Sequence, residues 1–167
     1  MFETNPKDLR ELLHEAHVGK LQLPDFQRSY VWSDEDVRSL IGSIARGFPV
    51  GALLTLENGG PVGFAPRLIE GAPGGGGIQQ LLLDGQQRIT SLYGALYSRK
   101  PMRTRPRRDA RKSVQRFYFL DIALAVTEAE NIEGAVLGVG ADLTLPDGLH
   151  SIRHDFSTQA LQFDAMA

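Results

Sequence analysis

The stretch LLLDGQQRITSL, residues 81–92, decides the fold of this chain. Its apolar beginning, Leu81–Leu83, predicts a buried strand, and the apolar residues from Ile89 to about Ser98 recur at the spacing of one helix face. Between the two lies the polar turn Asp84–Arg88, DGQQR. A strand, a tight turn and a helix in this order indicate an α/β domain.

Further elements are predicted on the N-terminal side of this unit. Leucines at helical spacing predict a helix that is capped by Thr4 or Asn5, runs to about His17 and is ended by Gly19. Leu21–Phe26 alternates like a short strand, with Pro24 at an edge or a strand end. Ser33 then caps a helix whose apolar face is formed by Val37, Leu40, Ile41 and Ile44.

Two more strands and one loop complete the predicted organisation. Gly51–Glu57 (GALLTLE) and Phe117–Ala125 (FYFLDIALA) are apolar enough for buried strands. The segment 71–77 (GAPGGGG) predicts a flexible loop. The sequence beyond Ala125 is weakly patterned, and its end lacks a cap or an apolar closing element. We expect residues 1–167 to form one domain, with the front part of a longer chain as the alternative to a complete protein.

Composition excludes several classes of protein. With 167 residues, 42% hydrophobic and 23% charged, the chain has the size and balance of one globular domain. No segment approaches the roughly 20 apolar residues of a membrane span, and the charged N-terminus is unlike a signal peptide, so we expect a cytoplasmic location. The absence of cysteine excludes disulfides, thiolate catalysis and cysteine zinc sites.

Positive charge is concentrated in one segment. Nine of the 18 basic residues lie between Arg99 and Arg116, where Asp109 is the only acid. Such a segment suits a polyanion such as DNA, but a solvated mobile loop is an equal alternative. The candidate DNA-binding residues are Arg103, Arg105, Arg107, Arg108, Arg111 and Lys112.

The turn DGQQR has the chemistry of a phosphate site. A helix that begins directly after a strand directs unpaired backbone NH groups and a positive dipole end at a ligand. Gly85 permits close approach, Gln86 and Gln87 are neutral donors, and Arg88 can bind phosphate oxygens in a bidentate manner. Asp84 can bind Mg²⁺ or a ribose hydroxyl. In the alternative interpretation, the aspartate caps the helix and the arginine pairs with a carboxylate.

The second candidate segment is FQRSYVW, Phe26–Trp32, in which Gln27 and Arg28 stand among three aromatic residues. Aromatic rings beside an arginine can stack on a base and hold its phosphates. Alternatively, the aromatic rings belong to the core and the arginine pairs with an acid. The chain contains no Walker loop, GxSxG, HExxH or GxGxxG motif.

Together the two segments resemble a known family. LPDFQRSYVW (23–32) followed by LLLDGQQRITSL (81–92) is similar to the N-terminal domain of GmrSD-type, modification-dependent (type IV) restriction endonucleases, which is related to the ParB/sulfiredoxin-like fold. The similarity covers roughly Leu9–Tyr97. It implies an α/β (α+β) domain, a small mixed sheet with flanking helices, that binds and hydrolyses a nucleoside triphosphate in phage defence.

The resemblance also implies site residues and partners. Those for nucleotide binding are Gln27, Arg28, Tyr30, Asp84, Gly85, Gln86, Gln87, Arg88 and Thr90. Gln86, Gln87 and Arg88 are the catalytic candidates, and Mg²⁺ would be held through Asp84. Family members that cleave DNA carry a further HNH-type nuclease domain, and this chain has no such motif. We therefore expect DNA and a nuclease domain or subunit as partners. The alternative is a non-catalytic module that senses DNA through residues 99–116.

Overall fold

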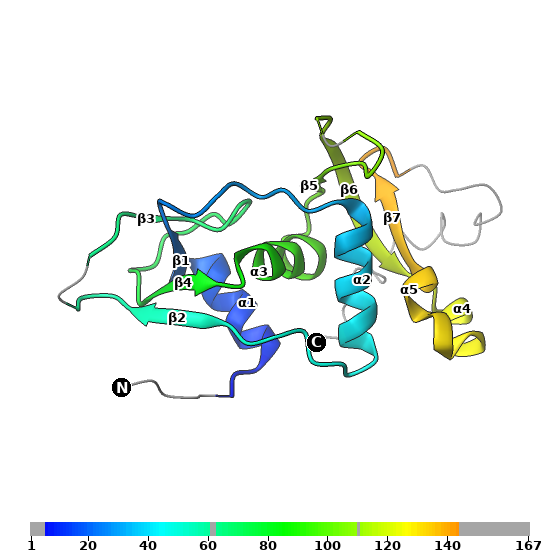
Figure 1. The fold of residues 1–167 in the computed structure, drawn as a ribbon, viewed down its shortest axis with the longest axis horizontal. Helices are drawn as coiled ribbons and strands as arrows, with labels where there is room; N and C mark the ends of the chain where they lie inside the picture. Colours follow the sequence, from blue (N-terminus) through cyan, green and yellow to red (C-terminus); the bar gives the residue numbers. More distant parts are fainter. Residues whose placement is uncertain (1–5, 61–62, 110, 144–167) are drawn as a thin grey trace.

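The computed structural model describes residues 6–60, 63–109 and 111–143 (Figure 1). They form two small sheets with helices, an α+β fold as predicted. The helices are α1 (Leu9–Val18), α2 (Asp34–Ala45), α3 (Gln86–Leu92), the π-helix η1 (Tyr93–Tyr97), α4 (Ile122–Thr127), the 3₁₀ helix η2 (Ala129–Asn131) and α5 (Ile132–Ala135). The strands are β1 (Leu21–Pro24), β2 (Leu54–Glu57), β3 (Pro66–Arg67), β4 (Gln80–Asp84), β5 (Met102–Thr104), β6 (Val114–Leu120) and β7 (Val136–Gly140). No helix in these ranges is long and apolar enough to cross a membrane.

The first sheet is mixed and carries the DGQQR turn. Its strand order is β2-β4-β1-β3, with β1 parallel to β4 and the other two pairs antiparallel. β4 therefore lies inside the sheet, and α3 starts directly where it ends. The core on this sheet includes Leu13 of α1, Leu21, Leu82, Ile89 and Tyr93, all at most 1% exposed. This packing fixes the position of the strand–turn–helix unit.

The second sheet was not predicted as a separate layer. It is antiparallel with the order β5-β6-β7, and α2 lies between it and the first sheet, in contact with both α3 and β7 (Figure 1). Its core includes Tyr30, Val37, Tyr118 and Val136, and Trp32 packs against the cores of both sheets. Segment 26–32 therefore joins the two halves of the fold.

Three sequence predictions were wrong in detail. The cap of α1 is Asp8, whose side chain accepts a hydrogen bond from the backbone NH of Arg10, because the helix begins only at Leu9. The predicted strand 51–57 begins at Leu54 and is mostly exposed, because β2 is an edge strand. The predicted strand 117–125 ends at Leu120, because Asp121 caps a new helix there.

The predicted cap of α2 is confirmed, and it has the form of a capping box. A substitution that removes the cap gives a first testable prediction. The Ser33 hydroxyl accepts from the NH of Asp36, whose carboxylate accepts from the NH of Ser33. We expect Ser33→Ala to lower the free energy of unfolding by about 1 kcal/mol in urea titrations. Ser43→Ala, inside the same helix, is the control and should change it by less than about 0.5 kcal/mol. Equal effects of the two substitutions would contradict the capping role.

Candidate functional site

The two candidate segments, 56–58 residues apart in sequence, meet in the structure. The Gln86 side-chain amide donates to the carbonyl of Arg28 at 2.6 Å. The Gln87 amide donates to the carbonyl of Ser29 at 3.3 Å and accepts from the NH of Val31 at 3.0 Å. Both glutamines are buried. Their side chains therefore fix the backbone of segment 26–32 to the start of α3.

Two further side chains strengthen this junction. The Gln27 amide donates to the carbonyl of Leu83 at 2.6 Å, so it binds the end of β4. Arg67 of β3 donates to the carbonyls of Gln27 and Arg28 at 3.0 and 3.1 Å. The sequence analysis missed Arg67, because it lies in a Gly- and Pro-rich stretch and belongs to neither motif. No sequence signal other than its charge could have indicated its role.

Arg88 is turned towards the protein. Its guanidinium donates to the carbonyls of Val50 and Ala52 at 2.7 and 2.8 Å, and lies 3.3 Å from the Asp84 carboxylate. Its side chain is 18% exposed. Arg88 therefore holds loop 50–52 against the turn. Its contact with Asp84 is the arginine–carboxylate pair that the alternative interpretation of the sequence predicted.

The exposed side chains at the junction are those of Asp84 and Arg28. The Asp84 side chain is 72% exposed and does not cap the helix. Gly85 takes the cap position with a φ of 94°, and no side-chain capping hydrogen bond is present among the described residues. Arg28 is exposed, and its guanidinium makes no hydrogen bond or ion pair within the described ranges. An exposed guanidinium and an exposed carboxylate therefore lie at the junction, beside the buried start of α3.

Tyr30 and Thr90, the other implied nucleotide contacts, are buried at 4% and 3% exposure. The hydroxyl of Ser91 donates to the carbonyl of Gln87, so the Tyr30 hydroxyl donates to Ser91 at 2.8 Å. Burial raises the pKa of the Tyr30 phenol, which keeps it a neutral donor. The Thr90 hydroxyl is buried and has no hydrogen-bond partner among the described residues. In this conformation both side chains belong to the interior beside the junction.

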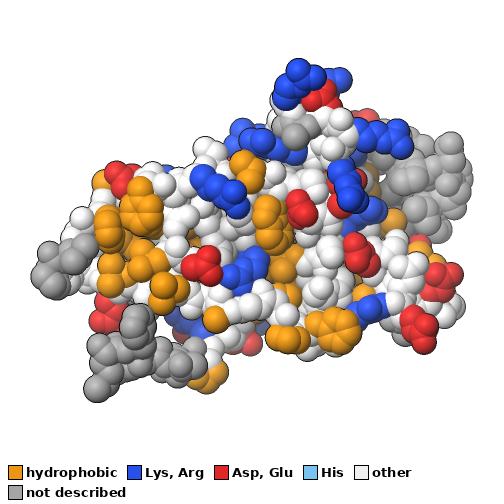
Figure 2. All heavy atoms as spheres, viewed as in Figure 1, with side chains coloured by type: hydrophobic (Ala, Val, Ile, Leu, Met, Phe, Trp, Pro, Cys, Tyr) orange, Lys and Arg blue, Asp and Glu red, His pale blue; other side chains and the backbone are white. Residues whose placement is uncertain are grey.

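Within the basic segment, residues 102–104 form β5 and Val114 begins β6, and the two strands pair with each other. Arg103 binds Glu70 through two hydrogen bonds of 2.9 and 3.1 Å, which raise the pKa of its guanidinium. Arg107 and Arg108 are exposed. Figure 2 shows Lys and Arg side chains gathered in the upper right part of this face, where Figure 1 places β5 and β6.

Metal ligands are sparse in the described ranges. No group of three or more histidine, aspartate or glutamate side chains there is arranged to hold a metal ion. Mg²⁺ in nucleotide sites is commonly held by one or two carboxylates together with phosphate oxygens. Asp84 is the acid placed at the turn; one oxygen contacts Arg88, and the other makes no hydrogen bond within the described part of the chain. The residues present therefore fit a metal ion that arrives with a phosphate ligand.

These features define an α+β domain organised around one strand–turn–helix unit with an arginine-bearing segment docked on it. The chain belongs to the family described as "GmrSD restriction endonuclease, N-terminal domain", whose model matches residues 9–136. The resemblance predicted from the two motifs is thus confirmed, and the match extends into the second sheet.

One similar protein is much longer than the region that it shares with this chain. An uncharacterised protein of Methanocaldococcus jannaschii is 38% identical over 104 residues, which cover 55% of this chain. The matched part is 17% of the length of that protein. The region shared with this chain is therefore a small part of a much larger polypeptide.

Proposed function

We propose that the chain is a cytoplasmic nucleoside-triphosphate-binding and hydrolysing module of a DNA restriction system. Nucleotide state at this module controls action on foreign or modified DNA by a nuclease domain or subunit. Family membership supports the restriction context, and the much greater length of the matched relative is consistent with further domains.

The observation that carries the nucleotide proposal is the docking of segment 26–32 on the DGQQR turn. It brings the backbone of Arg28, whose guanidinium is exposed and unpaired in the described part of the chain, against the turn that carries the exposed carboxylate of Asp84. Guanidinium groups bind phosphate oxygens in a bidentate manner. Arg28 and the turn thus form the phosphate-binding part of the proposed site.

Asp84 is the metal-holding residue of the proposed site. Its exposed carboxylate can bind Mg²⁺ that is also bound by the triphosphate. When bound, the ion would neutralise part of the negative charge on the phosphate oxygens. The pairing of one carboxylate oxygen with Arg88 keeps the side chain directed along the turn.

Gln86, Gln87 and Arg88 are positioning residues in this proposal. Their polar atoms are engaged with carbonyl and NH groups of segments 28–31 and 50–52. A water molecule can be oriented by either glutamine only after one of these hydrogen bonds is exchanged. Arg28, rather than Arg88, is the arginine available to offset charge that develops on the phosphate.

The test is isothermal titration of the wild type and Arg28→Ala with each of the four ribonucleoside triphosphates and Mg²⁺. We expect Arg28→Ala to weaken binding roughly tenfold to hundredfold, since a charge-assisted contact contributes about 1.5–3 kcal/mol. Arg107→Ala removes an exposed arginine outside the junction and should leave the affinity unchanged. Phosphate release measured on the same samples tests hydrolysis. A folded wild type that binds none of the four nucleotides would refute the proposal.

A further inference from the structure

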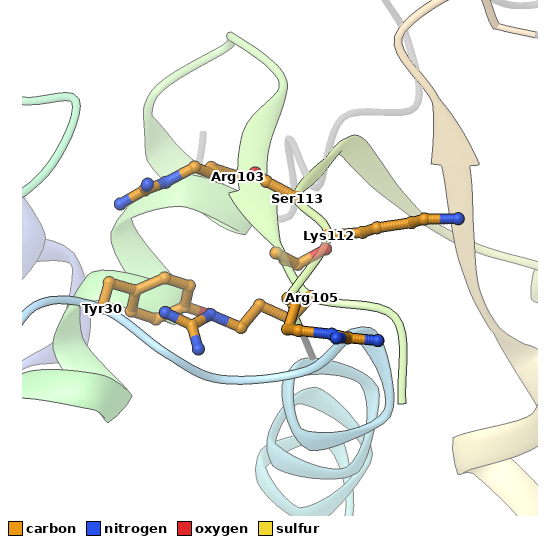
Figure 3. A pocket seen from close by; sticks show the side chains of 7 residues that line it. Tyr30, Arg103, Arg105, Lys112 and Ser113 are labelled. Carbon is orange, nitrogen blue, oxygen red and sulfur yellow. The ribbon is translucent and has the colours of Figure 1, made fainter. Parts of the chain in front are cut away.

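A cavity of about 380 Å³ lies between the basic segment and the buried face of segment 26–32. Arg103, Arg105, Arg111 and Lys112 contribute to its lining, together with the ring of Tyr30. Figure 3 shows Tyr30 across from Arg103 of β5 and from residues that connect β5 to β6, with the side chains of Arg103 and Lys112 extending in opposite directions. The cavity is distinct from the DGQQR turn, because no residue of 84–88 lines it.

The cavity is lined by more cationic side chains than there are acidic side chains to neutralise them. Arg103 is engaged by Glu70, and the single carboxylate of Asp109 lies 3.5 Å from Arg111 and 3.8 Å from Lys112. Both contacts with Asp109 are long, and both cationic side chains are largely exposed. Arg105 is half-buried and its side chain makes no ion pair with any described residue. An anion in the cavity would therefore meet uncompensated positive charge.

The backbone of Arg105 is held on both sides. Its NH donates to the carbonyl of Trp32 at 3.2 Å, and its carbonyl accepts from the NH of Asp34 at 3.1 Å. These hydrogen bonds join the basic segment to the residues between Tyr30 and α2. A side chain on a fixed backbone loses less entropy when it binds a ligand. Arg105 is therefore the preorganised cation of the cavity.

We propose that this cavity binds a phosphate ester, with Arg105 as the anchor and with Arg111 and Lys112 at the rim. Guanidinium groups match phosphate oxygens in charge and geometry. The phosphate belongs either to the backbone of a DNA strand or to a nucleotide, and the two sources differ in how affinity depends on chain length and salt. The proposal does not rest on nucleotide binding at residues 84–88.

The experiment compares two double variants that remove the same charge from the same segment. Arg105→Gln/Arg111→Gln changes the cavity, and Arg107→Gln/Arg108→Gln changes two exposed arginines that do not line it. Binding of fluorescent single- and double-stranded oligonucleotides is measured by anisotropy across a salt series. Binding of ATP and of inorganic phosphate is measured by calorimetry.

We expect the cavity variant to lose at least tenfold in affinity for oligonucleotides if the source is a DNA strand, or to lose an ATP or phosphate binding site that Arg28→Ala keeps if the source is a nucleotide. If the source is a DNA strand, the slope of log affinity against log salt concentration should also become less steep in the cavity variant, by the amount expected for about two phosphate contacts. The Arg107/Arg108 variant should lose less than threefold. Equal losses in the two variants, or no wild-type binding in any arm, would overturn the proposal.

Two further variants keep the outcome interpretable. Arg111→Gln alone changes a side chain that is 95% exposed, so weakened binding there cannot come from misfolding. Arg28→Ala, which should weaken ATP binding at the proposed nucleotide site, should leave the affinity for oligonucleotides unchanged, which separates the two sites. A loss of oligonucleotide affinity in Arg28→Ala as large as in the cavity variant would contradict a separate site.

Discussion

Arg88→Ala should lower the free energy of unfolding by about 2–4 kcal/mol, measured by urea denaturation with Trp32 fluorescence as the probe. The substitution removes two charge-assisted hydrogen bonds, to the carbonyls of Val50 and Ala52, and the contact with Asp84. A hydrogen bond to a charged group contributes about 1.5–3 kcal/mol, and the partly exposed site reduces the sum. Loop 50–52 would then lose its attachment to the turn.

Two comparisons define what Arg88 does. Arg88→Lys should recover less than half of the loss, because one ammonium group cannot reproduce the bidentate contact with two carbonyls. Arg107→Ala, on an exposed side chain, should change stability by less than about 0.5 kcal/mol. Where Arg88→Ala is still folded, we expect it to bind nucleotide more strongly than Arg28→Ala does. Unchanged stability with lost binding would instead make Arg88 a direct phosphate ligand.

Local signals in the sequence were sufficient for the elements that carry the junction. Ser33 and its three following acids predicted the start of α2, and Gly19 predicted the end of α1, where it adopts a left-handed φ of 81°. The strand and helix around DGQQR followed from apolar spacing alone. These features depend on neighbours within a few residues, which a sequence displays directly.

The second sheet depends on partners that are distant in sequence. β5 lies inside the basic segment, and β7 contains Gly138 and Gly140, which weaken a strand pattern. β6 was extended wrongly past Leu120, because Asp121 was counted as a strand residue when its side chain caps a helix. Pairing with β6 stabilises both weak strands, and periodicity does not reveal that pairing.

The roles within the candidate site were also decided by tertiary contacts. Sequence reasoning indicated that segments 26–32 and 84–88 belong together, and the structure brings them into contact. It could not indicate that Gln86, Gln87 and Arg88 would bind backbone groups 36–58 residues away. Donors of these types bind carbonyl and phosphate oxygens equally well. Only the fold determines which oxygens they meet.

Gly51→Ala should be as destabilising as the loss of Arg88, by about 2–4 kcal/mol, and for a connected reason. Gly51 has a φ of +94°, which an alanine adopts at a cost of about 1–2 kcal/mol. A Cβ atom there would also lie 2.5 Å from Nη1 of Arg88, which is bound to the neighbouring carbonyl of Val50. The guanidinium must therefore shift, which weakens its hydrogen bonds to the carbonyls of Val50 and Ala52.

A double-mutant cycle separates these two costs. In the Arg88→Ala background the collision is absent, so Gly51→Ala should cost only the backbone strain of about 1–2 kcal/mol. Gly59→Ala is the matched control, since Gly59 has a φ of +97° with no atom of the described residues within 4 Å of an added Cβ, and it should cost the same in either background. Additive effects of Gly51→Ala and Arg88→Ala in urea denaturation would show that the guanidinium does not hold loop 50–52.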